Sequence, residues 1–387
     1  MGVDCFFAVS PIHRLERHIN HKNYQHCSAT VGGVGAPCNK TKHYMTRNWT
    51  GSGHLCACRN GEFPVSPIRI VTENASLKAA VIGAGAFGRH HANKYRSLNG
   101  VDLVAIADPS AEVRRTALAN YGAPCVADWR ELLGKVDLVS VCTPAVTHSA
   151  IVRAFLNAGA HVMVEKPIAT AIEEADDLVA LACSTGRVLT VGHQERFVFS
   201  QSGLLDQKEM PLEVSCWRKG PWTGRGADVS VVLDLMIHDL DLVHQLIPGA
   251  VRSVQARGHC EQSLLCDEVK AAIMFENGAV ARLETSRVAE SRSRGMRAIY
   301  SDGMVEIDFL TRTVKNTTPR PLKSIEVADP LGESVASFVR AVQTGTEPLV
   351  RAEEARDALA TALLIDEAAE RTIHGRSRRP LVAAAAR

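Results

Sequence analysis

Two side chains able to handle a proton stand four residues apart in the motif Asp-Leu-Met-Ile-His-Asp, residues 234–239. Residues with this spacing share one face of a helix, so the motif predicts that Asp234 and His238 enter one cleft. An imidazole that titrates near neutrality can take the proton of an alcohol hydroxyl while a hydride leaves the carbon. We predict His238 as a general base, with Asp234 orienting it or holding a neighbouring hydroxyl. The alternative is an ordinary helix with a charged first turn and a core-facing histidine.

A third candidate, Lys166, belongs to the motif Glu-Lys-Pro at residues 165–167, directly after the apolar run 161–164. If this run is a strand of a parallel sheet, the motif lies at the carboxyl edge, where ligands of open α/β folds bind. A lysine there would polarise a developing alkoxide or carbonyl with its positive charge. Taken on its own, such a lysine is more often an ordinary surface residue.

A Gly-x-Gly-x-x-Gly motif, residues 83–88, follows an apolar run and opens a helix-like stretch. The first glycine permits a tight turn, the second lets the backbone approach a pyrophosphate, and the third lets the helix pack close to the strand. Asp108 ends the next apolar run, where its carboxylate can accept from adenosine ribose hydroxyls and oppose a 2′-phosphate. The pattern predicts NAD over NADP, against the alternative of a glycine turn without a nucleotide. The predicted contacts are Gly83, Gly85, Ala86, Phe87, Gly88 and Asp108.

Strand-like and helix-like segments alternate from residue 77 to residue 191. Alternation of this kind predicts a parallel sheet with right-handed crossovers and helices on both faces. We therefore predict a Rossmann dinucleotide-binding domain over residues 77–196. Its expected strands are 78–82, 103–107, 138–142, 161–164 and 188–191, and its expected helices lie around 88–98, 111–120, 147–158 and 171–184.

Longer strand-like segments follow residue 197. The steps Asn277-Gly278 and Asp302-Gly303 between them are typical of tight hairpins. These features predict an α+β substrate and oligomerisation domain over 197–375, with a large, mainly antiparallel open sheet, and then a tail over 376–387. Its expected strands are 212–219, 251–258, 269–275, 279–286, 296–301 and 304–309, and helices are expected near 332–343 and 352–373.

Residues 1–76 differ from the rest of the chain in composition and in hydrophobic pattern. Up to residue 60 they hold seven Lys or Arg but only two acidic residues, and they show no helical or strand period. We expect a disordered extension, or upstream sequence translated from a misplaced start. A targeting leader is an alternative, although no clear apolar core with a cleavage site is visible. A zinc site at His43, His54, Cys56 and Cys58 is another, but the paired ligand spacings are absent and we predict no metal.

The bulk composition favours a small-molecule partner. Forty-four basic and 42 acidic residues leave a net charge of +2, too small to predict a nucleic-acid or membrane-surface protein. No apolar run approaches the roughly 18 residues that a membrane span needs. The six cysteines after residue 60 lie mostly in apolar segments without disulfide-framework spacing. They predict reduced thiols and a soluble, cytoplasmic protein.

Two further motifs accompany the glycine, Glu-Lys-Pro and Asp-x-x-x-His motifs. They are Thr-Pro at 143–144 with a histidine at 148, and Gly-His-Gln-Glu-Arg-Phe at 192–197. Together with Glu-Lys-Pro and Asp-x-x-x-His they resemble the glucose-fructose oxidoreductase, inositol dehydrogenase and MocA (Gfo/Idh/MocA) family, from about residue 77 to about residue 371. The resemblance implies that Lys166 reaches the nicotinamide and the reacting hydroxyl, with Asp234 and His238 beside it. It also implies cofactor contacts from Thr143, Pro144, His148, Glu165 and Lys166.

The segment 217–228, taken with residues 192–197 and 284–287, looks like the family branch that oxidises the 3-hydroxyl of UDP-N-acetylglucosamine or its uronate. Fork-shaped guanidinium groups beside a Gly/Pro-rich loop could pair with a diphosphate. The alternative is that these arginines are solvent-exposed, as arginines in loops usually are. The candidate substrate contacts are Arg196, Arg218 and Arg225.

Two alternatives remain open. One is an inositol or free-sugar dehydrogenase of the same family, and the other is a non-catalytic, nucleotide-sensing regulator, against which the three chemical side chains argue. The family likeness implies a homodimer or homotetramer. No motif role is predicted for Asp239, Asp241 or His244, and the two aspartates are expected to be solvent-facing or structural.

Overall fold

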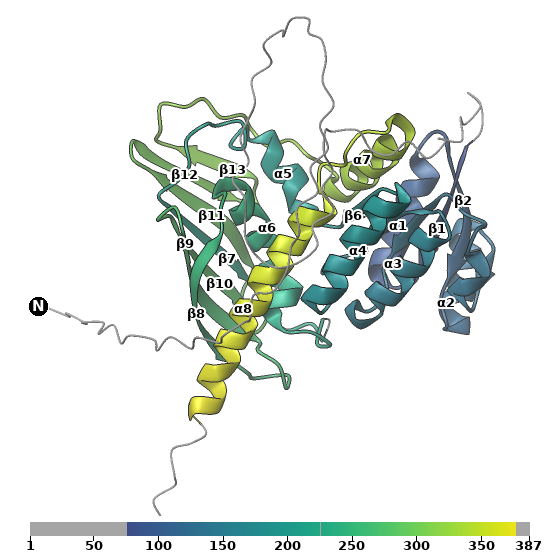
Figure 1. The fold of residues 1–387 in the computed structure, drawn as a ribbon, viewed down its shortest axis with the longest axis horizontal. Helices are drawn as coiled ribbons and strands as arrows, with labels where there is room; N and C mark the ends of the chain where they lie inside the picture. Colours follow the sequence, from purple (N-terminus) through teal and green to yellow (C-terminus); the bar gives the residue numbers. More distant parts are fainter. Residues whose placement is uncertain (1–75, 225, 377–387) are drawn as a thin grey trace, which may run out of the picture. The chain divides into compact units, whose positions relative to one another are not determined.

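The computed structural model describes residues 76–224 and 226–376, which form two β-sheets and their covering helices (Figure 1). The predictions for residues 1–75, including the zinc alternative, lie outside these residues. So do Arg225 and the expected tail beyond residue 376.

The first sheet is parallel, with the strand order β3-β2-β1-β4-β5-β6. Strand order reverses between β1 and β4, and ligands of such folds bind at the carboxyl ends of the strands beside that point. All four residues of β4 are buried, as expected for a strand covered on both faces. The strands are β1 (Leu77–Ile82), β2 (Val101–Ala107), β3 (Cys125–Val126), β4 (Leu138–Val141), β5 (His161–Val164) and β6 (Leu189–Val191).

Helices cover both faces of this sheet because alternate strand residues point to opposite sides. One face packs with α1, α2 and the later helix α7 in a separate apolar cluster, and α3 and α4 pack against the other face. Ser110 caps α2 by accepting from the backbone N–H of Val113 at 3.3 Å. The helices are α1 (Ala86–Ser97), α2 (Ala111–Tyr121), α3 (His148–Asn157) and α4 (Ile172–Thr185), with short 3₁₀ turns at Trp129–Leu132 and Ala145–Thr147.

The second sheet has seven strands in the order β13-β12-β11-β7-β10-β9-β8. Every neighbouring pair is antiparallel except β7 with β10, which run parallel. The predicted hairpins join β9 to β10 and β11 to β12. The strands are β7 (Glu213–Lys219), β8 (Val251–His259), β9 (Glu268–Phe275), β10 (Val280–Ser286), β11 (Ser293–Tyr300), β12 (Gly303–Asp308) and β13 (Thr313–Asn316).

Four helices follow the first sheet in the sequence and pack on the two sheets or on one another. α6 packs against β7 and the long helix α8, which lies across the second sheet beside β8 (Figure 1). A widened π-helical turn, Val232–Met236, precedes α6. Asp329 caps α7 by accepting from Gly332 N–H at 3.0 Å. The helices are α5 (Glu195–Gln201), α6 (Ile237–Leu246), α7 (Pro330–Thr344) and α8 (Ala352–Arg376).

The predicted fold class is confirmed: a Rossmann sheet is followed by a mainly antiparallel one. The elements β3, β13 and α5, of two, four and seven residues, were not predicted. The domain bounds 77–196 and 197–375 stay a prediction, and two features complicate them. The bound at residue 196 falls inside α5, and α7 packs with α1 on the first sheet.

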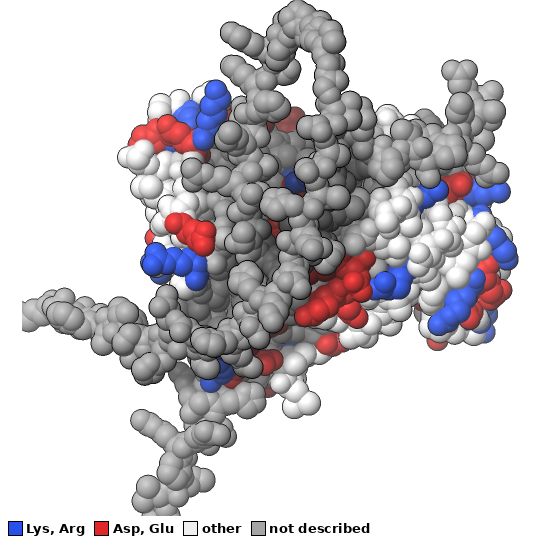
Figure 2. Space-filling view, viewed as in Figure 1, with Lys and Arg blue, Asp and Glu red and all other residues white. Residues whose placement is uncertain are grey.

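Within residues 76–224 and 226–376, no helix is both long and apolar enough to cross a membrane. On the face shown in Figure 2, acidic and basic side chains of the described residues lie side by side. This mixture agrees with the small net charge of the sequence.

Candidate active site

The glycine motif forms a tight turn between β1 and α1 whose three glycines differ in their surroundings. Gly83 has φ +86°, and a Cβ there would lie 2.7 Å from the Cys142 carbonyl oxygen. A Cβ on Gly88 would overlap the carbonyl oxygen of Gly83, so helix and strand can approach this closely only at glycine. Gly85, by contrast, has no neighbouring atom within 4 Å of that position. The turn is therefore closed on its inner side and open above Gly85, as a pyrophosphate site requires.

Asp108 stands beside this turn at the end of β2. Its carboxylate accepts from the backbone N–H groups of Ala84 and Ser110, both at 2.9 Å. The carboxylate oxygens keep lone pairs for further donors, since each can accept more than one hydrogen bond. The glycine turn and this carboxylate fit the pyrophosphate and ribose of NAD.

The next residues of the motif open onto a hollow. Phe87 is 39% exposed, and together with Ala86 it borders a cavity of about 280 Å³. The remaining lining residues come from α1, from Gln194 after β6, and from the start of α7: they are His90, Lys94, Gln194, Asp329 and Leu331.

The loop after β4 is held from beneath by His148. Its ring nitrogens lie 2.7 Å from the Pro167 carbonyl oxygen and 2.9 Å from that of Thr143. The ring is buried and both nitrogens lie against backbone carbonyl oxygens, so His148 positions the two loops. The cofactor contact predicted for His148 stays a prediction. Thr143 is half-buried, accepting from the Thr147 hydroxyl at 2.7 Å, and Pro144 is exposed.

Glu165 likewise points inward. Its Oε1 lies 2.9 Å from Nε2 of His91, whose Nδ1 lies 3.0 Å from the Ser140 hydroxyl. Burial raises the pKa of Glu165, but the His91 hydrogen bond and charge outweigh it, and the pKa lies below its usual value. This buried ion pair anchors the chain next to Lys166, and the cofactor contact predicted for Glu165 stays a prediction.

Lys166 meets Asp234 across the gap between the two sheets. Lys166 Nζ donates to the Asp234 carboxylate at 2.8 Å and to the Asp234 carbonyl oxygen at 2.6 Å. An ammonium group has three donors, so one remains for a ligand. Asp234 lies in the π-helical turn, a distortion that often marks functional sites. Its carboxylate holds Lys166, whereas the sequence predicted that it orients His238 or holds a neighbouring hydroxyl.

His238 follows in the first turn of α6 with a lowered basicity. Burial is the main cause, and the positive charges of Arg218 and Lys166 add to it, so the pKa of His238 lies well below its usual value. The ring is therefore neutral at pH 7 and can accept a proton. Its Nδ1 is buried and has no hydrogen-bond partner among the described residues.

A second histidine, His193, faces this ring and was given no role from the sequence. It follows β6 at the carboxyl edge of the first sheet, and its ring centroid lies 5.9 Å from that of His238, edge to face. The residue before it, Gly192, packs directly on Glu165: a Cβ there would lie 2.7 Å from Oε1. Only its place in the motif at 192–197 could have drawn attention to His193.

Two of the three predicted substrate arginines are occupied elsewhere. Arg218 is 2% exposed and forms bidentate hydrogen bonds with Asp239 and a further one with Glu195. Arg196, also 2% exposed, is paired with Asp241 and with Glu354 of α8. These carboxylates use guanidinium donors, so both side chains tie elements together. The substrate contacts predicted for them stay a prediction. Asp239 and Asp241 are correspondingly buried and structural, not solvent-facing.

The arginine with the least engaged guanidinium near His238 is one that the sequence did not single out. Arg294 of β11 stands opposite Arg218 of β7, and its nearest carboxylate is Glu195 at 3.7 Å. The Arg294 side chain is 37% exposed. Its charge also contributes to the lowered pKa of His238. A positive group is therefore available to a ligand at this edge of the site.

The loop that holds the third predicted arginine is anchored at its end. Arg287 donates to the carbonyl oxygens of Gly226 and Val229 at 2.6 and 3.0 Å, pairs with Asp267, and stacks over Trp222 at 5.3 Å. Gly226 lies directly against the Asp234 carboxylate. The loop thus borders the site, although Arg225 itself is not described.

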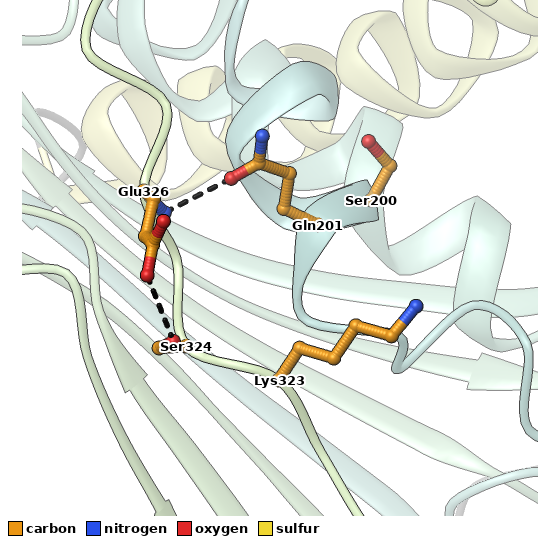
Figure 3. A pocket seen from close by; sticks show the side chains of 5 residues that line it. All are labelled: Ser200, Gln201, Lys323, Ser324 and Glu326. Carbon is orange, nitrogen blue, oxygen red and sulfur yellow. Dashed lines mark hydrogen bonds between the residues drawn. The ribbon is translucent and has the colours of Figure 1, made fainter.

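Another hollow of about 410 Å³ lies between α5 and the segment before α7 (Figure 3). Glu326 N–H donates to the Gln201 side-chain oxygen at 2.9 Å, and Ser200, Lys323 and Ser324 complete the lining. None of the catalytic candidates lines it. Among the described residues, no group of three or more His, Cys, Asp or Glu side chains is placed to hold a metal.

The Rossmann sheet, the glycine turn with its carboxylate and the adjoining cluster of Lys166, Asp234 and His238 define an NAD-dependent dehydrogenase acting on CH–OH groups. Residues 77–193 match the family model described as "Oxidoreductase family, NAD-binding Rossmann fold", and residues 205–306 match the "GFO/IDH/MocA C-terminal domain". The chain belongs to the Gfo/Idh/MocA family.

Individual relatives are consistent with this assignment. The chain is 34% identical to UDP-N-acetylglucosamine 3-dehydrogenase of Acidithiobacillus ferrooxidans over 62% of its own length and 76% of the relative's. The solved structure of that enzyme aligns with a TM-score of 0.72 over 78% of this chain and 100% of that one. An inositol 2-dehydrogenase/D-chiro-inositol 3-dehydrogenase of Halalkalibacterium halodurans is 31% identical over 46% of this chain and 55% of its own. A Bordetella pertussis dehydrogenase solved with NADH and UDP-GlcNAcA shares the fold, with 17% identity and a TM-score of 0.69. The alignment covers 77% of this chain and 96% of that one.

Proposed function

We propose that this enzyme oxidises a secondary hydroxyl of a UDP-sugar, specifically the 3-hydroxyl of UDP-N-acetylglucosamine or a close relative. The observation that carries the chemistry is the cluster of Lys166, Asp234 and His238 between the two sheets. The substrate proposal is supported by the 34% identity to a UDP-N-acetylglucosamine 3-dehydrogenase.

Each member of the cluster has a distinct task. His238, neutral because burial and nearby cations lower its pKa, takes the hydroxyl proton. Lys166 directs its free N–H at the same oxygen and stabilises the alkoxide as it forms. Asp234 holds the ammonium group in place through a charged hydrogen bond of 2.8 Å. NAD, when bound, supplies the acceptor for the hydride.

The cofactor is held by the glycine turn and the end of β2. Gly83 and Gly88 shape the turn, Gly85 leaves room for the pyrophosphate, and Asp108 accepts from the ribose hydroxyls. Ala86, Phe87, Thr143 and Pro144 border the same edge of the sheet, where we propose that they contact the cofactor.

A charged substrate is favoured by Arg294. Arg218 contacts two carboxylates, whereas the one ion pair of Arg294 within the described residues is the 3.7 Å contact to Glu195, which Arg218 already engages. An available guanidinium beside a base suits a substrate that carries phosphate or carboxylate groups. Arg225, also proposed from the sequence, would act from the neighbouring loop.

A substrate panel tests this proposal. UDP-sugars, free sugars and inositols are each offered with NAD, and turnover is followed by NADH absorbance. We expect UDP-N-acetylglucosamine or its uronate to give the highest kcat/KM. Turnover of inositols or free sugars alone would overturn the substrate proposal and favour the alternative that the inositol dehydrogenase relative supports.

A pair of variants sharpens the panel. Arg294→Met should raise KM for the UDP-sugar by about 10- to 100-fold, as expected for a lost charge-assisted contact of ~1.5–3 kcal/mol. Arg292→Met removes the same charge from an exposed position two residues away and is the control. Equal effects of the two variants would show that Arg294 acts only through general electrostatics.

Assembly and location complete the proposal. Met274 and Ile299, on outward rows of the second sheet, are 43% and 38% exposed, which supports a homodimer or homotetramer through this sheet. No disulfide bond joins the six described cysteines, as in a reducing compartment, and we propose a cytoplasmic enzyme. Sedimentation equilibrium of the full chain tests the assembly.

A further inference from the structure

His193 is a buried histidine without a partner. It is 1% exposed, and neither ring nitrogen has a hydrogen-bond partner among the described residues. Buried polar atoms are nearly always paired, so two unpaired nitrogens on one ring indicate that a further group completes the site. The rings of His193 and His238 meet edge to face at 5.9 Å between centroids, and no direct hydrogen bond joins them. A group that joins their nitrogens would therefore come from outside the described side chains.

The charges around the two rings differ. Burial is the largest effect on both rings and opposes a proton on each, and on His238 the charges of Arg218, Lys166, His193 and Arg294 all add to that opposition. His193 is opposed by Arg196 and Lys166 but favoured by Asp241 and Glu165.

The carboxylate nearest in effect to His193 is that of Asp241, which favours a proton on the ring more strongly than any other charge. Asp241 and Glu354 are matched by Arg196 and Arg351, so the cluster as a whole is balanced in charge. A proton is therefore stabilised more at His193 than at His238.

We propose that His193 is the second member of a proton relay, receiving through one bridging oxygen the proton that His238 removes from the substrate hydroxyl. The proposal rests on the proposed function of His238. In the oxidation, the C–H bond breaks with hydride transfer to NAD⁺, and the O–H bond breaks with proton transfer to His238. The bridging oxygen then takes that proton and passes its own to His193, which releases one proton to water after the ketone leaves. The relay restores neutral His238 for the next turnover.

The kinetic test uses His193→Gln in the full-length enzyme with the best substrate of the panel. Glutamine can hydrogen-bond but cannot carry the proton, so kcat should fall by about tenfold or more while KM for sugar and NAD stays within about twofold. The solvent deuterium isotope effect on kcat should increase. Free imidazole should restore part of the turnover of His193→Ala.

The matched control is His244→Gln. His244 is also buried and lies on α6, but its Nε2 is paired with the Thr361 hydroxyl at 2.8 Å. Its loss should change thermal stability without altering the isotope effect or responding to imidazole. An unchanged kcat for His193→Gln would overturn the relay. A raised KM with normal kcat would overturn it too, by making His193 a binder of a substrate hydroxyl.

A test without turnover separates failure of the relay from failure of the proposed function. In ¹⁵N-histidine NMR of the full chain, coupled rings titrate as a pair, and removal of His193 should move the His238 titration to higher pH. An unchanged His238 titration would contradict coupling even if no substrate of the panel is turned over. Should the wild type be inactive on every substrate while the coupling is present, the proposed substrate and base role fail and the histidine pair remains.

Discussion

Single residues of the site take their chemistry from what surrounds them. His238 becomes a neutral base because burial and three nearby cations oppose its protonation. Glu165 becomes an inward anchor because His91 pairs with it. Lys166 retains one free donor because only two of its three reach Asp234. The surroundings of these three side chains come from residues up to 74 positions away in the sequence. The motifs therefore indicated which residues belong to the site, but not the direction in which each side chain points.

Cofactor choice is decided at one residue. Asp108→Ala should weaken NAD binding by about tenfold and narrow the preference over NADP, because the ribose hydroxyls lose their acceptor and a 2′-phosphate loses its repulsion. Calorimetry with both cofactors measures this. Asp102→Ala, an exposed change on the same strand, is the control. An unaltered NAD to NADP ratio in Asp108→Ala would refute the assignment.

Elements that follow a simple period could be predicted from the sequence, and those shaped by distant contacts could not. All five strands predicted for the first sheet are present, because buried parallel strands are short apolar runs between turns. The parallel pairing of β7 with β10 was not predicted, because pairing between strands separated by β8 and β9 leaves no local pattern. The π-helical turn at Asp234 also went unpredicted, since its residues are typical of an α-helix.

Two substitutions in the glycine turn should have different effects, one on NAD affinity and the other on thermal stability. Gly85→Ala should leave the melting temperature nearly unchanged, because its side chain would enter open space, and should weaken NAD binding by about tenfold. Gly88→Ala should instead destabilise the protein, because its Cβ meets the Gly83 carbonyl. Thermal melts and NAD titration check both. Normal NAD affinity in a folded Gly85→Ala variant would argue against a pyrophosphate at this turn.

Strand β5 carries a pH-dependent contribution to stability through His161. Its Nδ1 accepts from the Val188 backbone N–H at 2.9 Å, and burial, with the nearby charge of Arg187, lowers the pKa to about 4. Between the unfolded value near 6.5 and pH 4 the unfolded chain binds more protons, so stability is lost as the pH falls.

This contribution amounts to about 2 kcal/mol between pH 7 and pH 5. His161→Gln should remove that part of the pH dependence of the free energy of unfolding, measured by urea denaturation at both values. An equal pH dependence in the variant and the wild type would contradict the assignment.

Across the whole molecule, buried ion pairs connect elements that neighbour different sheets. Arg196 of α5 joins Asp241 of α6 to Glu354 at the start of α8. In the sequence these charges resemble solvated residues, and Arg196 was predicted to contact substrate from the family resemblance of the motif at 192–197. Only the fold brings their partners together and buries them.

Arg196→Met should therefore unfold more easily, by about 3 kcal/mol or more, because it leaves a buried aspartate unpaired. Arg351→Met removes an exposed ion pair with the same Glu354 and should cost less than about 1 kcal/mol. Urea denaturation compares them. Wild-type stability with a raised substrate KM in Arg196→Met would support the substrate contact instead.

The catalytic assignment gives an ordered set of effects on the whole enzyme. Lys166→Met should reduce turnover at least as much as loss of the base, because it removes both alkoxide stabilisation and substrate positioning. Asp234→Asn keeps the shape of the side chain without its charge and should give an intermediate defect. In the wild type, kcat/KM should fall as the pH drops through the pKa of His238, so the acid limb should lie below about pH 6.5.

The most direct test of the account is the turnover number of His238→Ala at saturating NAD and the best substrate of the panel. We expect kcat to fall by about 100-fold or more with NAD affinity within about twofold of the wild type, as for loss of a general base. Near-normal turnover in this variant would contradict the assignment and leave Lys166 or a bound water to take the proton.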